Sequence, residues 1–259
     1  MTEPFSPTEW YLLANRLTTD DLAPGELERI NQVEELFEVN RARFDWDPTT
    51  TALVVIDMQN YFVHPDSPAR CYQATRVLPL IRRLCDECRA LDVPVIFTQT
   101  HFGKDTDRSF RPIFGDRLAE WLAEGSWGAE LCPELGRLPH ERVVPAKHTY
   151  DSFEGTDLDY VLRSRGIETV IICGTNTDRC CEATARRAFG LQYQVVFGSD
   201  VNATDSGMQH LATLRSVRYG FGQVLTAEEI IQHLRVAASS SADDHVDSVV
   251  SEAHSEGVS

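Results

Sequence analysis

The chain has 259 residues, of which 42% are hydrophobic and 25% are charged, so it can bury one sizeable core and does not require two. Its formal net charge of −16 and the lack of a basic stripe argue against nucleic acid as a partner. The apolar runs are too short to span a membrane, and the first residues lack the positive segment of a secretory signal. Seven cysteines, an odd number, fit reduced thiols, so we expect a cytoplasmic protein without disulfides.

Residues 1–47 are predicted to form an N-terminal helical arm. Helical periodicity occurs in Thr8–Leu17 and again in Pro24–Arg43, with a turn-like segment between the two. The second piece places most of its apolar side chains on one face, and such a face needs a surface to pack against. That surface belongs either to the main domain or to another subunit.

From Thr51 onward, short apolar runs alternate with helical segments, and we take residues 48–236 as the main domain. The runs are apolar on both faces, as strands are when helices cover both sides of a parallel sheet. The alternation therefore predicts an α/β fold with a doubly wound sheet. The predicted strands are 51–57, 93–99, 142–146, 169–174, 193–198 and 221–225, and the predicted helices are 74–91, 156–166, 178–190, 207–220 and 227–236.

The connection Phe102–Glu141 is longer than is usual inside a compact domain. Loops of this length often form lids or pocket walls, and the alternative is a surface insertion with one helix. Both interpretations stay open at this point.

Residues 237–259 differ in composition from the main domain. They are polar and acidic and contain no aromatic side chain, so they cannot bury enough surface to order themselves. We expect a flexible acidic tail.

Polar side chains follow three of the predicted strands at their carboxyl ends, which is where ligands bind in doubly wound sheets. Asp57 closes the first run, Lys147 follows the third, and Cys180 lies in the turn after the fourth. If the strands are parallel neighbours, a carboxylate, an ammonium and a thiol meet at one edge of the sheet. Taken singly, each residue has an ordinary explanation as a cap, a solvated lysine or a buried core residue.

Together, the three residues supply the parts of nucleophilic catalysis. A helix N-terminus and a nearby cation lower the pKa of a thiol, so we expect a lowered pKa for Cys180. Asp57 would accept the thiol proton and return it to a leaving amine, and Lys147 would keep Asp57 ionised. The backbone N–H groups of Asn176 and Cys180 are candidates for an oxyanion hole.

Three motifs resemble the isochorismatase-like cysteine hydrolase superfamily in wording, order and spacing. They read IDMQNYF at the end of the first run, KHTYDSFEGTDL after the third and GTNTDRCCEATARRA after the fourth. The resemblance extends from Thr51 to about Leu234.

The resemblance implies a Rossmann-like, six-stranded parallel sheet with helices on both faces, and a homo-oligomer, either a dimer or a tetramer. It implies that Asp57, Lys147 and Cys180 form a catalytic triad. It also implies a cis peptide bond between Thr175 and Asn176 in the nucleophile turn. The neighbouring Cys181 stands where the family usually has valine, and we interpret it as a core residue.

No metal ion or other cofactor is expected. The nicotinamidase branch carries two metal ligands in a D-x-H arrangement after the second strand, whereas Thr100 and Phe102 occupy those positions here, with His101 between them. A lone histidine is no metal site, and the C-x-x-C formed by Cys85 and Cys88 lies in a predicted helix without a second pair.

The presence of a cysteine also narrows the reaction. The isochorismatase branch proper cleaves a vinyl ether and generally lacks the nucleophilic cysteine, so Cys180 favours hydrolysis of a C–N bond in a small amide, ureido or carbamoyl compound. A vinyl-ether hydrolase and a catalytically silent binding module remain the alternatives.

The expected partner is a small-molecule substrate, and its contacts are sought near strand ends and in the long connection. Ordinary packing is the alternative for the aromatic candidates. Arg179, directly before the nucleophile, is a candidate for binding a substrate carboxylate or, alternatively, a solvated residue of the first helical turn. The candidate contacts are Phe62, Gln99, His101, Trp127, Tyr150, Phe153 and Arg179.

Overall fold

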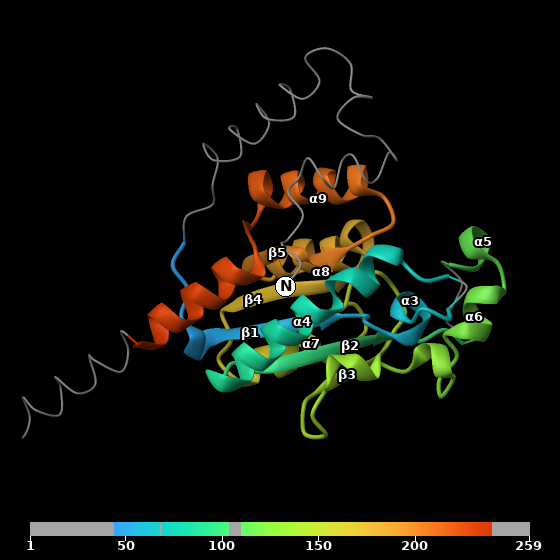
Figure 1. Ribbon diagram of the computed structural model, residues 1–259, viewed down its shortest axis with the longest axis horizontal. Coiled ribbons are helices and arrows are strands. Elements are labelled where there is room, and N and C mark those ends of the chain that lie inside the picture. The colour runs from blue at the N-terminus through green and yellow to red at the C-terminus, as the bar shows by residue number, and fades with distance from the viewer. Residues whose placement is uncertain (1–43, 68, 104–109, 240–259) are drawn as a thin grey trace, which may run out of the picture.

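The computed structural model describes residues 44–67, 69–103 and 110–239 (Figure 1). Nearly all of the main domain predicted at 48–236 is therefore described. The predicted N-terminal arm and flexible tail lie outside the described residues, apart from 44–47 and 237–239.

Six strands of the described residues form one parallel sheet in the order β3-β2-β1-β4-β5-β6. Sheet growth reverses between β1 and β4, which is the topological switch point of a doubly wound fold. Every predicted run overlaps one of these strands, so the predicted α/β fold is confirmed. The strands are β1 (Thr51–Ile56), β2 (Val95–Thr100), β3 (Val143–Lys147), β4 (Thr169–Thr175), β5 (Gln194–Ala203) and β6 (Gln223–Leu225).

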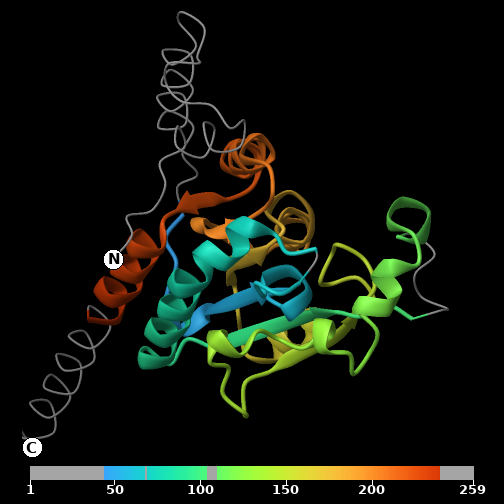
Figure 2. The same cartoon turned by 45° about the vertical axis from the view of Figure 1, so that its right-hand side comes forward.

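Helices cover both faces of the sheet (Figures 1 and 2). On one face, Leu53 and Val55 of β1 pack with α4 and with residues 227–239, which are helical. On the other face, Val54 and Ile56 pack with α7, α8 and α9. The alternation of neighbouring β1 residues between two cores explains why the run is apolar throughout. These helices are α4 (Tyr72–Ala90), α7 (Leu158–Ser164), α8 (Glu182–Gly190) and α9 (Gly207–Gly220).

The long connection lies at one end of the sheet, beside the short helix α3 (Figure 1). Phe102, Phe110 and Leu122 form a small apolar cluster of their own, with Phe62 and Tyr150 packed against it. The connection contains more than the single helix of a plain surface insertion, because it builds this cluster over the carboxyl ends of the strands. Helix α3 spans Asn60–Val63. The connection itself contains α5 (Arg111–Phe114), α6 (Arg117–Trp121) and two 3-10 turns, Trp127–Ala129 and Pro133–Leu135.

Most elements differ from their predicted bounds by one to three residues, and two differ by more. Strand β5 continues through a polar segment to Ala203, where the buried Asn202 donates from Nδ2 to the carbonyls of Ile172 and Gly198. The helix predicted at 178–190 is split, since Thr177–Cys181 forms a π-helical turn and α8 starts only after it.

Two expectations about the class of protein can be compared with the described residues. No helix among them is long and apolar enough to cross a membrane. All seven cysteines lie in the described part of the chain and all are free thiols, as expected.

The close approach of β4 to β1 gives a first prediction. Gly174 has a φ of +128°, and a Cβ there would overlap the backbone carbonyl of Ile56. We predict that Gly174→Ala lowers the free energy of unfolding by about 3 kcal/mol or more, measured by urea denaturation. Gly190→Ala is the matched control, because nothing lies within 4 Å of its added carbon. Equal effects of the two substitutions would contradict the prediction.

Candidate active site

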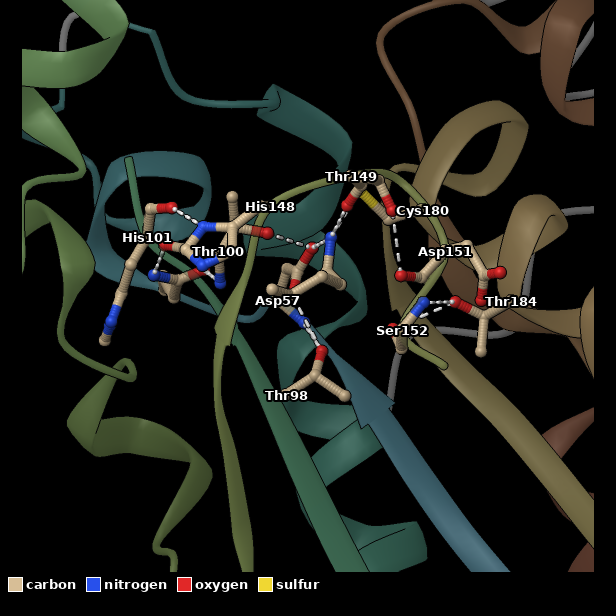
Figure 3. A network of polar contacts seen from close by, with 12 residues as sticks. Asp57, Thr98, Thr100, His101, His148, Thr149, Asp151, Ser152, Cys180 and Thr184 are labelled. Atoms are coloured by element: carbon tan, nitrogen blue, oxygen red, sulfur yellow. Dashed lines mark hydrogen bonds and ion pairs between the residues drawn. The ribbon is translucent and has the colours of Figure 1, made fainter. Parts of the chain in front are cut away.

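The candidate site lies where β1, β2, β3 and β4 end, at the switch point of the sheet (Figure 3). Asp57 follows β1 directly, with a φ of +46°, and is completely buried. Thr98 Oγ1 donates to Asp57 Oδ1 at 2.7 Å, and Thr100 Oγ1 donates to Oδ2 at 2.8 Å. The two threonines are two positions apart on β2, so their side chains share one face of the strand and hold the carboxylate in one orientation.

Lys147 ends β3 and is also completely buried. Its Nζ lies 2.7 Å from Asp57 Oδ2, donates to the carbonyl of Thr149 at 2.9 Å and reaches Cys180 Sγ at 3.4 Å. Burial alone would lower the pKa of Lys147, but the charge of Asp57 and the contact with Cys180 together raise it above its usual value. Lys147 is therefore an ammonium group whose three N–H bonds all have partners.

Cys180 lies in the π-helical turn after β4, with 6% of its surface exposed. Burial raises the pKa of its thiol to about 12; Lys147 opposes this rise, and the carboxylate of Asp57 adds to it. The lowered thiol pKa expected from the sequence is therefore wrong for the free protein. The charge of Lys147 is already balanced by Asp57, and the sulfur precedes the first residue of α8, Glu182.

The turn that carries Cys180 begins at a cis peptide bond between Thr175 and Asn176, as the resemblance implied. The carbonyl of Asn176 accepts from the N–H groups of Arg179 and Cys181, both at 3.1 Å. These two hydrogen bonds fix the backbone on either side of the sulfur.

A buried histidine supports the same turn from α9. His210 Nε2 faces the carbonyl of Ser199 at 3.0 Å, and a carbonyl only accepts, so this nitrogen carries the proton. His210 Nδ1 is then the acceptor for the hydroxyl of Thr177, 2.9 Å away. Burial lowers the pKa of His210 to about 4, which keeps the ring neutral in this arrangement.

A cavity of about 240 Å³ adjoins the sulfur. Cys180 and Asn176 line it, and so do three of the predicted substrate contacts, Phe62, Tyr150 and Arg179. The volume is below the range of about 300–1,000 Å³ of most ligand pockets, which suits a small molecule.

Gln99 and Trp127 do not line this cavity. Gln99 lies between the two threonines on β2, so its side chain leaves the opposite face of the strand, where it donates to the carbonyl of Ala129 at 3.0 Å. Trp127 is 41% exposed and stacks edge-on with His64. Both were predicted as substrate contacts because Gln99 ends a predicted strand and Trp127 lies in the long connection. These positions along the chain do not determine where a side chain points.

His101 and Phe153 also lie away from the cavity lining. The backbone carbonyl of His101 contacts His148 Nδ1 at 3.1 Å, and burial lowers the pKa of the His101 ring. Phe153 is buried in the core on the α7 and α8 face, where it stacks on Tyr193 with ring centroids 5.9 Å apart. For Phe153, the alternative of ordinary packing describes the structure.

Several residues around the site were not singled out from the sequence. Thr98 and Thr100 hold Asp57, and their signal was two hydroxyls at alternate positions of an otherwise apolar strand. Phe110, Phe114 and Asp205 also line the cavity. The two phenylalanines lie in the long connection, outside the sheet, and Asp205 follows β5, whose end was predicted five residues too early.

The positions that would carry nicotinamidase-type metal ligands do not suit a metal. The hydroxyl of Thr100 is engaged with Asp57, and Phe102 is buried in the apolar cluster of the connection. Among the described residues, no group of three or more His, Cys, Asp or Glu side chains could hold a metal ion.

Comparison with known proteins decides the family. A family model described as the Isochorismatase domain matches residues 51–229. The chain belongs to the isochorismatase family.

Three relatives in this family cover most of the domain. "Uncharacterized isochorismatase family protein YwoC" of Bacillus subtilis (strain 168) is 36% identical over 192 residues, which are 71% of this chain and 94% of that protein. Nicotinamidase 3 of Arabidopsis thaliana is 32% identical, covering 73% and 91%. Ureidoacrylate amidohydrolase RutB of Pseudomonas syringae pv. syringae (strain B728a) is 30% identical, covering 70% and 82%.

Solved structures agree with this assignment. A cysteine hydrolase from Pseudomonas syringae pv. phaseolicola 1448A has a TM-score of 0.72 at 29% identity, covering 76% of this chain and 98% of that one. The N-carbamoylsarcosine amidase from Thermoplasma acidophilum has a TM-score of 0.60 at 27% identity, covering 69% and 96%. The chain is thus a hydrolase of the isochorismatase family in sequence and in fold.

The support that His210 gives to the nucleophile turn predicts a pH dependence of stability. The unfolded chain protonates this histidine near pH 6.5 but the folded protein only near pH 4, so the unfolded state binds more protons between these values. The contribution of His210 to the free energy of unfolding is fully present above pH 6.5. It is lost as the pH falls towards 4, by about 3 kcal/mol in all. Urea unfolding between pH 7 and 4 should show a shallower loss in His210→Gln than in wild type. Parallel curves would contradict the prediction.

Proposed function

We propose that this chain is a cysteine amidohydrolase that cleaves a C–N bond in a small amide, ureido or carbamoyl compound without a metal ion. The observation that carries the proposal is the position of Lys147 Nζ, 2.7 Å from a carboxylate oxygen of Asp57 and 3.4 Å from the sulfur of Cys180. Relatives named nicotinamidase, ureidoacrylate amidohydrolase and N-carbamoylsarcosine amidase support the class of bond.

In the first half of the reaction, Asp57 takes the thiol proton while Cys180 Sγ attacks the carbonyl carbon of the substrate. An S–C bond forms, and the carbonyl oxygen becomes an oxyanion, whose stabilisation we assign to the backbone N–H groups of Asn176 and Cys180. When the tetrahedral intermediate collapses, the C–N bond breaks and the proton on Asp57 passes to the leaving nitrogen. Ammonia or an amine departs, and an acyl group remains on the sulfur.

In the second half, a water molecule takes the place of the leaving group. Asp57 accepts a proton from the water as its oxygen attacks the acyl carbon, and the oxyanion forms again in the same place. The C–S bond then breaks, the product leaves as an acid, and the proton on Asp57 returns to the sulfur. Each turnover consumes one water and restores the resting thiol.

Lys147 contributes its charge and no proton. In the resting site, burial lowers the pKa of Lys147, but the carboxylate of Asp57 and the contact with Cys180 together raise it above its usual value, so Lys147 is an ammonium group when the reaction begins. The same charge lies next to the sulfur and stabilises the thiolate as it forms. Thr98 and Thr100 keep the carboxylate in position through both halves of the reaction.

The acyl-enzyme on Cys180 is the step that can be tested most directly. Cys180→Ala removes the nucleophile and should lower ammonia release from amide and ureido substrates by about 1,000-fold or more. Mass spectrometry of wild-type protein quenched during turnover should show the acyl adduct on Cys180. Cys181→Ala is the matched control, because this neighbouring thiol is completely buried in the core and makes no part of the cavity lining described above.

The other reactions considered give different results in the same experiment. An isochorismatase-type hydrolase would keep its vinyl-ether hydrolysis in Cys180→Ala and lose it in Asp57→Ala. A binding module would turn over no amide in any form. Either result refutes the amidohydrolase proposal, provided that circular dichroism shows the Asp57 variant to be folded, since it leaves the charge of Lys147 buried without its partner.

We propose that the working enzyme is a cytoplasmic homo-oligomer, a dimer or a tetramer. The support is the apolar face predicted for residues 24–43, which needs a surface to pack against. Sedimentation of the full chain beside a chain lacking residues 1–43 should show a smaller assembly for the shortened form. An unchanged mass would count against this role of the arm.

A further inference from the structure

The cavity beside Cys180 has two walls of different chemistry. One wall is aromatic, with the ring of Phe110 in edge contact with Phe102 and with Tyr150, each at 4.9 Å between centroids. The rest of the lining includes the sulfur and the charged side chains of Arg179 and Asp205. Such a cavity suits a substrate with an apolar body and at least one charged group.

Lys147 does not provide that charge for the substrate, although it lines the cavity. Its ammonium group has three N–H bonds, and these point to Asp57, to the carbonyl of Thr149 and to Cys180. A substrate anion would have to displace a member of the catalytic group to reach it.

Arg179 has donors to spare. Its Nε lies 3.7 Å from Asp178 Oδ2, which is an ion pair but too long for a hydrogen bond. Burial raises the pKa of Tyr150, and the positive charge of Arg179 acts against this rise, so the guanidinium charge is felt at the aromatic wall. In the described lining of the cavity, Arg179 is the cation left to meet a ligand.

Asp205 is a carboxylate of the same cavity lining, and it already has a partner. The thiol of Cys71 is hydrogen-bonded to it, and after burial, the charge of Asp205 is the next cause of the raised pKa of Cys71. Asp205 is moreover exposed to solvent, where a charge attracts a ligand only weakly. The charged wall therefore favours an anionic ligand over a cationic one.

We propose that the substrate carries a carboxylate, bound by Arg179, in the same small molecule as the amide that Cys180 attacks. This inference rests on the proposed amidohydrolase function and names its substrate class. The planar fork of the guanidinium matches a carboxylate through two parallel hydrogen bonds. Because Arg179 directly precedes Cys180, the bound carboxylate also fixes how far the amide carbon lies from the sulfur.

The test uses pairs of amides in which a methyl group replaces the carboxyl group. The pairs are succinamic acid with butanamide, glutaramic acid with pentanamide, and 4-carbamoylbenzoic acid with 4-methylbenzamide. A cationic probe, 4-aminobutanamide, reports on Asp205. Binding is measured by calorimetry in Cys180→Ala protein, which does not turn over, and ammonia release is measured in protein with Cys180.

In at least one pair, the acid should bind about 10- to 100-fold more tightly than its methyl partner, and Arg179→Gln should remove this preference. Arg179→Lys keeps the positive charge but lacks the planar fork, so it should keep only part of the preference for the acid. Arg187→Gln is the matched control, because this arginine of α8 is 51% exposed, lies 3.8 Å from Asp151 and is absent from the cavity lining described above. Its preference for acids should equal that of the parent protein.

The inference is overturned if no acid is preferred, if the preference survives Arg179→Gln, or if 4-aminobutanamide binds best and loses affinity in Asp205→Asn. The two proposals can fail separately. Binding that depends on Arg179 without any ammonia release would support the carboxylate site and refute the amidohydrolase. Equal ammonia release from both members of every pair would do the opposite.

Discussion

The buried ion pair between Lys147 and Asp57 is the interaction on which the rest of the site depends. Both side chains are fully shielded from water, and removing two charges from water costs more than their attraction returns unless every other polar atom is satisfied. Here two threonine hydroxyls donate hydrogen bonds to the carboxylate of Asp57, and the ammonium group of Lys147 donates to the carbonyl of Thr149 and to the sulfur of Cys180. A hydrophobic pair would fill the space at less cost, so the charges are better explained by the chemistry they permit next to Cys180 than by stability.

Sheet topology places these groups at one level. The strand register pairs Ile56 with Gly174 and Thr100 with Lys147, so the four strands that carry the site end together. At the switch point, the chain leaves β1 and β4 in opposite directions, and the space between the departing segments is where a ligand can enter. The long connection then closes one side of that space with aromatic rings. The polar groups come from the regular part of the fold, and the apolar wall comes from the irregular part.

This division also explains what the sequence could predict. Strand ends are visible in the apolar runs, so Asp57, Lys147 and Cys180 could be placed at one edge, and the family motifs agree with that placement. Directions of side chains were harder to predict: Gln99 sits at a strand end like Thr100 but faces away, because the alternation of β2 assigns the inner face to the threonines. The pKa of Cys180 was missed because it depends on burial, and burial depends on packing from segments distant in the chain.

The high thiol pKa bears on how such a site works. The rate of attack depends both on the fraction of thiolate and on its nucleophilicity, which falls as the pKa falls, so a thiol with a high pKa depends on a base beside it to remove its proton. In the resting site, the proton stays on Cys180, within reach of the carboxylate that must carry it to the leaving nitrogen. Burial of the thiol therefore serves proton transfer: it keeps beside Asp57 the proton that the first half of the reaction gives to the leaving nitrogen, and the second half replaces that proton from water.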